Sequence, residues 1–452
     1  MRDLALATLV AIMLPFCFRR PWMGILFYVW FSLMNPHRLT YGFAYSMPWA
    51  FIIAVTTLAG MLVFKERKSI AWTPPMVLML ACLVYFTLTT FFAQSGSYAW
   101  DACNRFAKIV LIGLVLPIAI YGRMRIKYAL MVTALSVGFY GFKGGVFTLT
   151  HGGAFQVRGP ASSFIEDNNA LGCALVMVVP LLLWLARDES RKWLRRLYFV
   201  TMWLTMLSAV FTYSRGAMVG LAITAPMLFL RSKRKALVIL VLVPVAYFGS
   251  SLVPTELYDR AHSIEDYQTD TSAMQRLQAW GVAYNVAKER PFTGGGFMFE
   301  MVPDDVWLSY APFMVENASN YARAAHSIYF QVLGNHGFVA FGLFMGMLVT
   351  TLLSLRRMRR LALTRPDTAW IADMASAIQI SMLGYMVSGA FLSLAYFDLP
   401  YILIAITATL HRELVEAQAV AAGPASVSEP VETTISSPGR IRGAPNPQLR
   451  KQ

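Results

Sequence analysis

The chain has 452 residues, of which 57% are hydrophobic and 14% are charged, and its formal net charge is +15 at pH 7. A soluble protein carries about 25% charged residues, so this composition excludes an ordinary soluble globular protein. Apolar runs of roughly 20 residues, the length that a helix needs to cross a bilayer, recur along the chain. They are continuous rather than alternating, which excludes a β-barrel and predicts an all-α polytopic membrane protein.

The predicted spans begin with an ambiguous segment. Leu4–Phe16 and Trp22–Met34 are each short for a span, and Arg19-Arg-Pro21 separates them, so they form either one broken span or a hairpin. Counting this segment as one gives about twelve transmembrane helices. The other predicted spans are 46–64, 75–93, 105–121, 127–148, 168–186, 194–212, 215–230, 236–252, 326–355, 371–395 and 398–411.

Lysine and arginine gather in short links between these spans, at residues 65–68, 123–127, 187–196, 231–235 and 356–360. Cytoplasmic loops of membrane proteins carry such an excess of basic residues. We therefore interpret the net charge as a topology signal rather than as a nucleic-acid site. With these links in the cytoplasm, both termini are cytoplasmic and the long polar segment 251–325 lies in the periplasm.

This topology predicts four parts of the chain. A membrane helical scaffold covers residues 1–250, and a periplasmic loop with short helices covers 251–325. C-terminal membrane helices cover 326–412, and a disordered cytoplasmic tail, rich in Pro, Ser, Thr and Gly, covers 413–452. The four cysteines show neither metal-ligand spacing nor a disulfide pattern, and Asp304-Asp305 alone is weak evidence for a metal, so no metal site is expected.

Several basic residues fall on the predicted periplasmic half or at its membrane edge, against the topology bias: Arg105, Lys108, Lys143, Arg158, Arg215, Arg276 and Arg323. Cations kept there need an anionic partner, unless they extend to lipid headgroups or pair with loop carboxylates. We favour the second explanation for Arg105, Lys108 and Arg323. Arg215 differs, because it lies at a tight connection between two spans where a guanidinium can bind a phosphate through two parallel hydrogen bonds.

His326 is the second candidate, because it opens a long apolar span directly after the polar loop. The ordinary pKa of histidine suits proton transfer near neutral pH. A helix-capping or interfacial histidine is, on the residues alone, an equally good explanation. In the loop, Arg276 and Trp280 are four residues apart and share one face of a predicted helix. His336 is expected to belong to a helix break rather than to the site.

Four motifs in order carry a resemblance to a known family. They are Arg158-Gly with the Asn-x-Leu-Gly that ends at Gly172; Ser214-Arg215-Gly; Arg276, Trp280, Pro291 and Gly294-x-Gly; and His326, Gln331 and Gly337. Over these motifs the chain resembles the bacterial O-antigen ligase and O-antigen polymerase superfamily, and most of all an O-antigen ligase. The sequence departs from the family at Gly334-Asn-His-Gly337, where family members commonly carry an acidic residue before the glycine.

The resemblance implies an inner-membrane glycosyltransferase that acts at the periplasmic face. Its donor is a glycan on undecaprenyl diphosphate, its acceptor is the lipid A–core oligosaccharide, and it needs no nucleotide sugar. Because the sequence shows no ligand cluster, we expect neither a cofactor nor a metal. Arg215 and Arg276 would stabilise the departing diphosphate, with Arg158 as a third substrate-binding residue. His326 would be the general base, and direct attack by the acceptor hydroxyl would invert the anomeric configuration.

Two kinds of alternative remain open at this point. Within the enzymes, the chain is a polymerase that joins repeat units on the carrier, or a ligase for another glycan or a protein acceptor. Outside the enzymes, it is a transporter or flippase for lipid-linked glycans. A transporter predicts an inverted repeat and ionisable groups near mid-membrane, whereas here the basic residues gather at one face.

Overall fold

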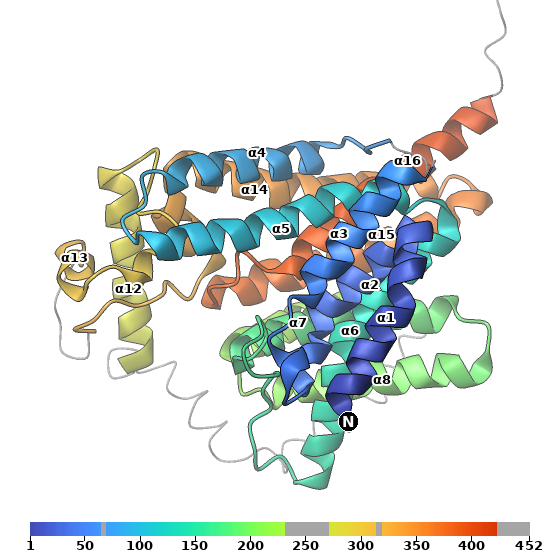
Figure 1. Ribbon diagram of the computed structural model, residues 1–452, viewed down its shortest axis with the longest axis horizontal. Coiled ribbons are helices and arrows are strands. Elements are labelled where there is room, and N and C mark those ends of the chain that lie inside the picture. Colours follow the sequence, from blue (N-terminus) through green and yellow to red (C-terminus); the bar gives the residue numbers. More distant parts are fainter. Residues whose placement is uncertain (65–68, 231–270, 313–318, 423–452) are drawn as a thin grey trace, which may run out of the picture.

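The computed structural model describes residues 1–64, 69–230, 271–312 and 319–422, and every regular element in these ranges is helical (Figure 1). The helices are α1 (Arg2–Arg19), α2 (Pro21–Met34), α3 (Trp49–Val63), α4 (Pro74–Thr90), α5 (Ser97–Ala119), α6 (Gly122–Thr150), α7 (Asn168–Asp188), α8 (Lys192–Val210), α9 (Arg215–Leu230), α12 (Thr271–Glu289), α13 (Asp304–Ser309), α14 (Ile328–Ala362), α15 (Ala369–Ser388) and α16 (Asp398–Ala422).

Five helical segments of the described residues are long and apolar enough to cross a membrane: α5, α6, α7, α14 and Pro366–Phe391, which contains α15. The all-helical membrane class is thus confirmed, whereas the count of twelve spans stays a prediction. The predicted span 236–252 lies outside the described residues, as do two basic links, at 65–68 and 231–235, part of the polar loop and the tail from 423 on. Helix α16 continues to Ala422, beyond the end predicted for the last membrane segment.

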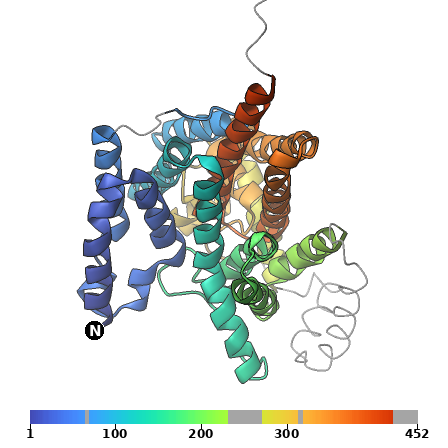
Figure 2. The same ribbon diagram turned by 90° about the vertical axis from the view of Figure 1, so that its right-hand side faces the viewer.

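The first segment, which the sequence left open, folds into two separate helices. Helices α1 and α2 pack against each other and both pack against α3, so the segment is a hairpin. Its turn lies at Arg20, between the end of α1 and Pro21 at the start of α2. In Figure 2 these three blue helices form a layer on one side of the molecule, with α14, α15 and α16 on the other side.

Helix α7 is the centre of the bundle. It is apolar around its whole circumference and buried along nearly its whole length, as expected for a helix surrounded by others. It packs against α6, α8, α9 and α15. Its first turn is capped by Asp167, whose carboxylate accepts hydrogen bonds from the backbone N–H groups of Asn169 and Ala170 at 2.9 and 3.2 Å.

Helices α6 and α8 approach very closely. A side chain at Gly141 would overlap the Thr205 side chain, and one at Gly145 would overlap the backbone of Leu204. Small residues at such positions let helices come together within a membrane. The two helices therefore form a continuous packed seam.

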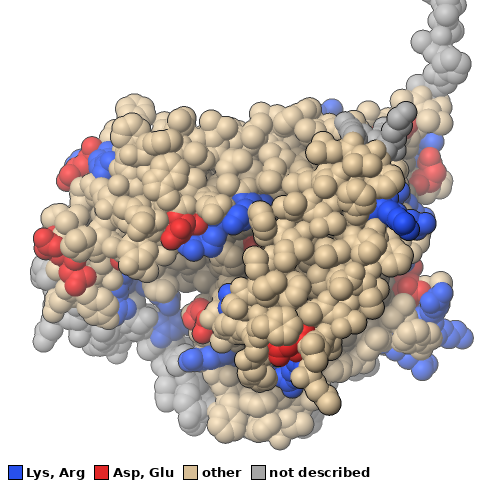
Figure 3. Space-filling model, in the orientation of Figure 1, with Lys and Arg blue, Asp and Glu red and all other residues tan. Residues whose placement is uncertain are grey.

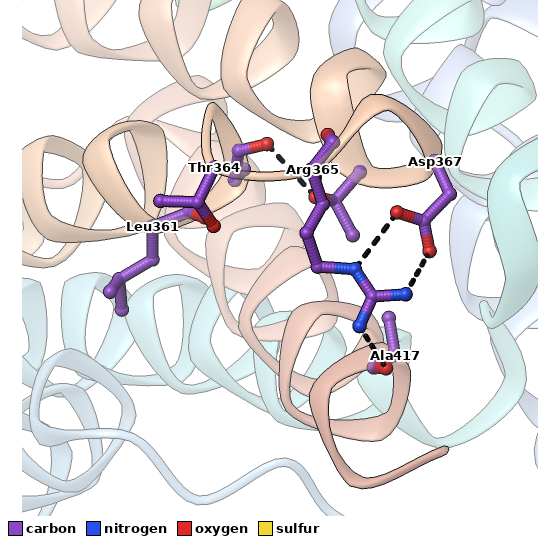
Figure 4. A network of polar contacts seen from close by, with 7 residues as sticks. Leu361, Thr364, Arg365, Asp367 and Ala417 are labelled. Carbon is purple, nitrogen blue, oxygen red and sulfur yellow. Dashed lines mark hydrogen bonds and ion pairs between the residues drawn. The ribbon is translucent and has the colours of Figure 1, made fainter. Parts of the chain in front are cut away.

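The two ends of the bundle differ. Helices α12 and α13 lie at one end, and the α7–α8 and α14–α15 links lie at the other (Figure 1). At the second end, Arg365 donates two hydrogen bonds to the Asp367 carboxylate, at 3.0 and 2.8 Å, and another to the Ala417 carbonyl oxygen (Figure 4). This network joins the α14–α15 turn to α16, on the side where the basic links lie.

Most of the visible surface is uncharged (Figure 3). Large apolar side chains are exposed on the outer helices, among them Phe51 and Val55 of α3, Val77 and Val84 of α4 and Leu111 of α5. A water-facing surface rarely exposes so many. Lipid is the environment that such a surface suits.

Helix α14 is broken at Gly337, which has φ 79°. The glycine-rich turn after α12 fills the break: the N–H groups of Gly295 and Gly296 donate to the carbonyl oxygens of Gly334 and Asn335 at 2.9 and 2.7 Å. These N–H groups are occupied within the fold, so the turn locks the loop to α14 and does not act as a phosphate cradle. The break near His336 that the sequence indicated is confirmed.

Replacing Gly337 with alanine is expected to destabilise the protein strongly. The left-handed backbone alone costs about 1–3 kcal/mol for a non-glycine residue, and the new methyl group would overlap the Pro291 carbonyl oxygen. The matched control is Gly342→Ala in the same helix, where the added methyl group meets nothing within 4 Å. Thermal unfolding in detergent measures both. An unchanged melting temperature for Gly337→Ala would show that the break is not needed.

Candidate active site

The turn between α8 and α9 is held firmly in place. Thr212 and Ser214 are buried, and Tyr213 has φ 54°, in the left-handed region that non-glycine residues rarely adopt. The Tyr213 hydroxyl donates to the Gly153 carbonyl oxygen at 2.6 Å. Arg215 is the first residue of α9, so this turn determines the position of the backbone from which the Arg215 side chain extends.

The loop before α7 and the first residue of α7 donate three hydrogen bonds to this turn. The side-chain amides of Gln156 and Asn168 both donate to the Thr212 carbonyl oxygen, at 3.2 and 2.8 Å. The backbone N–H of Val157 donates to the Phe211 carbonyl oxygen at 3.0 Å. Two motifs that are distant in the sequence therefore form one surface.

Trp280 anchors α12 to the segment that precedes α14. Its indole Nε1 donates to the Ala325 carbonyl oxygen at 2.7 Å, and its ring stacks on Phe330 with 5.0 Å between centroids. Arg276 lies one helical turn before Trp280, and His326 directly follows Ala325. The anchor thus brings the arginine of α12 towards the histidine.

His326 has an unusual backbone. Its φ is 46°, and its N–H donates to the Ser393 hydroxyl oxygen at 2.8 Å. Helix α14 begins at Ile328 with Ser327 at the N-cap position, so His326 precedes the helix and does not cap it. A left-handed non-glycine residue costs about 1–3 kcal/mol, and such residues cluster at functional sites.

The surroundings of His326 lower its pKa from the ordinary value of 6.5. The main cause is that neighbouring elements displace water from part of the imidazole, which disfavours its charged form. This lowering of the pKa is modest, because the rest of the side chain is exposed to solvent. The Arg276 cation lowers the pKa further, the Asp167 carboxylate opposes this, and Arg323 adds a smaller lowering. The imidazole is therefore neutral at pH 7, the form that accepts a proton.

The beginnings of α9 and α14 share one corner of the molecule. A Cβ at Gly216, next to Arg215, would lie 3.0 Å from the Ser388 carbonyl oxygen. A Cβ at Gly389 would lie 2.8 Å from the side chain of Ile328, the first residue of α14. The segment after α15 thus packs against both helix starts. In Figure 3, both basic and acidic side chains lie around the recess between α12 and the lower part of the molecule.

Comparison with known proteins identifies a domain in the middle of the chain. Residues 199–345 match the family described as O-antigen ligase. The chain contains a domain of the O-antigen ligase and polymerase superfamily. This O-antigen ligase domain holds Arg215, Arg276 and His326. Members of the family are inner-membrane, glycosyltransferase-like ligases and polymerases with lipid-linked glycans as substrates. Residues 1–190 match a family of unknown function, and no curated protein matches the chain.

Arg158, the third predicted substrate-binding residue, lies outside the O-antigen ligase domain and in different surroundings. Its Nε donates to the Gln156 side-chain oxygen at 3.0 Å. It lines an open cavity of about 260 Å³ together with Lys143. Neither His326 nor the other two arginines of the prediction line this cavity. The structure therefore does not place Arg158 in one pocket with them.

Asp167 is a residue that the sequence reasoning missed. It lies inside a quoted motif, but only the fold shows its carboxylate to be within electrostatic reach of His326. A carboxylate there favours the imidazolium that forms when the base accepts a proton. Asp167 is therefore positioned to stabilise a protonated His326.

Asp167→Asn is expected to shift the pH profile of turnover. The carboxylate raises the pKa of His326, so its removal lowers that pKa and moves the acid limb of kcat/KM to lower pH. Asparagine is as good an N-cap residue as aspartate, so α7 keeps its cap. The measurement is kcat/KM between about pH 4.5 and 8, around the ordinary histidine value. An unchanged acid limb would show that Asp167 does not influence the pKa of His326.

Glu300 is a second carboxyl that the sequence did not single out. It lines a cavity of about 20 Å³ with Arg323, Gln331 and Asn335, enough room for one water molecule. Burial raises the pKa of Glu300. Arg323, assigned from the sequence to lipid headgroups or loop carboxylates, lies in this cavity and also donates from Nε to the Ser319 hydroxyl at 3.0 Å.

The remaining candidates have roles within the fold. Asp304 accepts a hydrogen bond from the Ala322 N–H at 2.8 Å. His336 is fully buried, with its Nδ1 2.6 Å from the Thr89 hydroxyl oxygen and its ring stacked on Phe86 at 4.1 Å. Within the described ranges, no three His, Cys, Asp or Glu side chains gather as potential metal ligands.

Proposed function

We propose that this protein is an inner-membrane O-antigen ligase. It transfers a glycan from undecaprenyl diphosphate to the lipid A–core oligosaccharide at the periplasmic face. The observation that supports the proposal most is the position of His326, neutral and held in a strained backbone beside Arg276. The turn that carries Arg215 reaches the same corner of the fold.

The arginines act on the leaving group. Cleavage of the sugar–diphosphate bond builds negative charge on the departing phosphate oxygens. Guanidinium groups already fixed in position stabilise this charge without the cost of reorganising solvent. The buried turn holds the backbone at Arg215, and the Trp280 anchor holds the helix that carries Arg276. These two cations supply the positive charge that a metal ion supplies in other phosphate-dependent enzymes, so the reaction requires no metal.

The histidine acts on the acceptor. A sugar hydroxyl must lose its proton as it attacks the anomeric carbon, and His326 accepts that proton at a ring nitrogen. The C–O bond to the diphosphate breaks as the new glycosidic bond forms, with inversion at the anomeric carbon. Asp167 stabilises the imidazolium until the proton leaves to solvent. No covalent enzyme intermediate is needed.

Purified protein, lipid-linked glycan and lipid A–core, incubated in EDTA, test this proposal. We expect glycosylated lipid A–core and released undecaprenyl diphosphate in equal amounts. Longer chains that remain on the carrier would identify a polymerase instead. Movement of intact donor across a vesicle membrane without new glycosidic bonds would identify a transporter. Transfer only to another glycan or to a protein would keep the reaction class and change the acceptor.

The orientation is tested by cysteine labelling. The four native cysteines are buried, so labelling of an added cysteine is specific. Ser309, at the end of α13, and Ser190, in the α7–α8 link, are both exposed. In cells permeable only at the outer membrane, Ser309→Cys should react with an impermeant thiol reagent and Ser190→Cys should not. The opposite pattern would place the site in the cytoplasm.

A further inference from the structure

A second basic site lies near the C-terminal end of α6, which is drawn at the bottom of Figure 1. It is the open cavity of about 260 Å³ that Arg158 lines. Lys143, on α6, supplies a second cation, and Gln156 and Tyr140 supply polar groups. Leu39, Phe147, Val157 and Pro160 provide apolar walls.

Hydrogen bonds hold the walls of this cavity in place. The Tyr140 hydroxyl donates to the Met34 carbonyl oxygen and fixes the end of α2 against α6. The Tyr45 and Ser162 hydroxyls lie 3.2 Å apart and join the loop after α2 to the loop before α7. The Arg38 guanidinium stacks over the Tyr45 ring at 4.6 Å. The cavity is therefore built by the fold, from three segments that are distant in the sequence.

The described residues offer these two cations no carboxylate partner. Within the part of the chain that the structure describes, neither Lys143 nor Arg158 forms an ion pair with a carboxylate. The nearby Glu166 carboxylate accepts instead from the Ser162 N–H at 2.7 Å. Both side chains are exposed. Lys143 lies in the second half of α6, a helix long and apolar enough to span the membrane, and Arg158 lies in the loop that follows it.

We propose that this cavity binds a phosphate group carried by a lipid, as a second anion site apart from the one around His326. The two cations suit the phosphate, and the apolar walls suit the first carbons of the lipid. Basic pockets between membrane helices bind lipid phosphates in this way. Every residue that lines the cavity lies within residues 1–190, so the site gives the segment of unknown function a role in lipid binding.

Native mass spectrometry of the full chain in detergent tests the proposal without turnover, so that its outcome is independent of the transfer reaction. The probes are phosphatidic acid, undecaprenyl diphosphate, inorganic phosphate and diacylglycerol. The method counts the molecules bound to each protein, which separates this cavity from the site at Arg215 and Arg276. The variant is Lys143→Gln/Arg158→Gln, and the control is Lys192→Gln/Arg195→Gln, two exposed cations at the start of α8.

We expect the variant to bind the phosphate-bearing lipid about 30-fold more weakly, since each basic residue near the membrane surface contributes about 1 kcal/mol. The control should bind like the unaltered protein, and diacylglycerol should not distinguish the three. A preference for undecaprenyl diphosphate would identify the carrier as the ligand, and a preference for phosphatidic acid a membrane lipid. If the double variant does not fold, the single variant Arg158→Gln, whose substitution lies in an exposed loop, replaces it in the same measurement.

Three results would overturn the proposal. The first is unchanged binding of both phosphate-bearing lipids in a folded variant. The second is an equal loss in the Lys192→Gln/Arg195→Gln control. The third is inorganic phosphate binding as tightly as either lipid, which would show that the apolar walls contribute nothing.

Discussion

Replacing His326 with alanine is expected to lower turnover by about 10²–10⁴-fold, the range for a positioned proton acceptor. Binding of the lipid-linked donor should change little, because Arg215 and Arg276 hold the diphosphate. Turnover should also fall as the pH drops through the lowered pKa of His326, since only the neutral imidazole accepts a proton. The measurements are turnover against pH, donor binding and thermal unfolding in detergent.

His326→Asn separates the chemical role from a structural one. Asparagine tolerates the left-handed backbone better than most residues, and it keeps the N–H that donates to Ser393. It cannot act as a base near neutral pH. His151→Ala, which removes an exposed histidine from the end of α6, is the matched control. A folded His326→Asn protein with nearly normal turnover would remove the histidine from the mechanism and make Glu300 the next candidate.

Arg215→Lys and Arg276→Lys are each expected to lower turnover by about 10²-fold or more, the effect of losing one fixed donor to a developing oxyanion. Lysine keeps the charge but loses the planar pair of donors that matches a phosphate. Donor binding should weaken as well, which distinguishes these variants from His326→Ala. The measurements are kcat, KM for the lipid-linked donor and the melting temperature.

Arg365→Lys is the matched control for these two variants. Arg365 also forms a two-point contact, with Asp367, but at the other end of the bundle (Figure 4). Asp367 is exposed and Arg365 partly so, so the loss of this pair should cost little stability and no activity. Nearly normal turnover in both Arg215→Lys and Arg276→Lys would reduce these residues to general electrostatic attraction or lipid anchoring.

The helices were predictable because apolar runs and basic links are local signals. Helices occur at the predicted spans wherever the chain is described. The hairpin at Arg20 was not decided, because two basic residues and a proline fit both a kink and a turn. The break at Gly337 was predictable from its glycines, but its partner was not, because the turn at Gly294–Gly296 is distant in the sequence.

The site was predictable only as a set of residue types. The sequence indicated His326 and three arginines, but their arrangement depends on contacts between distant segments, such as Trp280 with Ala325. Asp167 lay unnoticed within a recognised motif, because its distance from His326 in the sequence hides their proximity. Conversely, Arg158 was grouped with the other arginines by its charge and its motif, although the fold gives it a cavity that the other two do not line.

The seam between α6 and α8 bears on how the two matched segments evolved and how they can be exchanged. The border between those segments falls at residues 191–198, yet α8 packs along α6 so closely that glycines replace side chains at the contact. The segment of unknown function is therefore not a removable module. A hybrid that joins residues 1–190 of one relative to the ligase domain of another must inherit complementary α6 and α8 surfaces, or it will not assemble. The two contacting surfaces must therefore evolve together, because a change on one helix limits the changes that the other can accept.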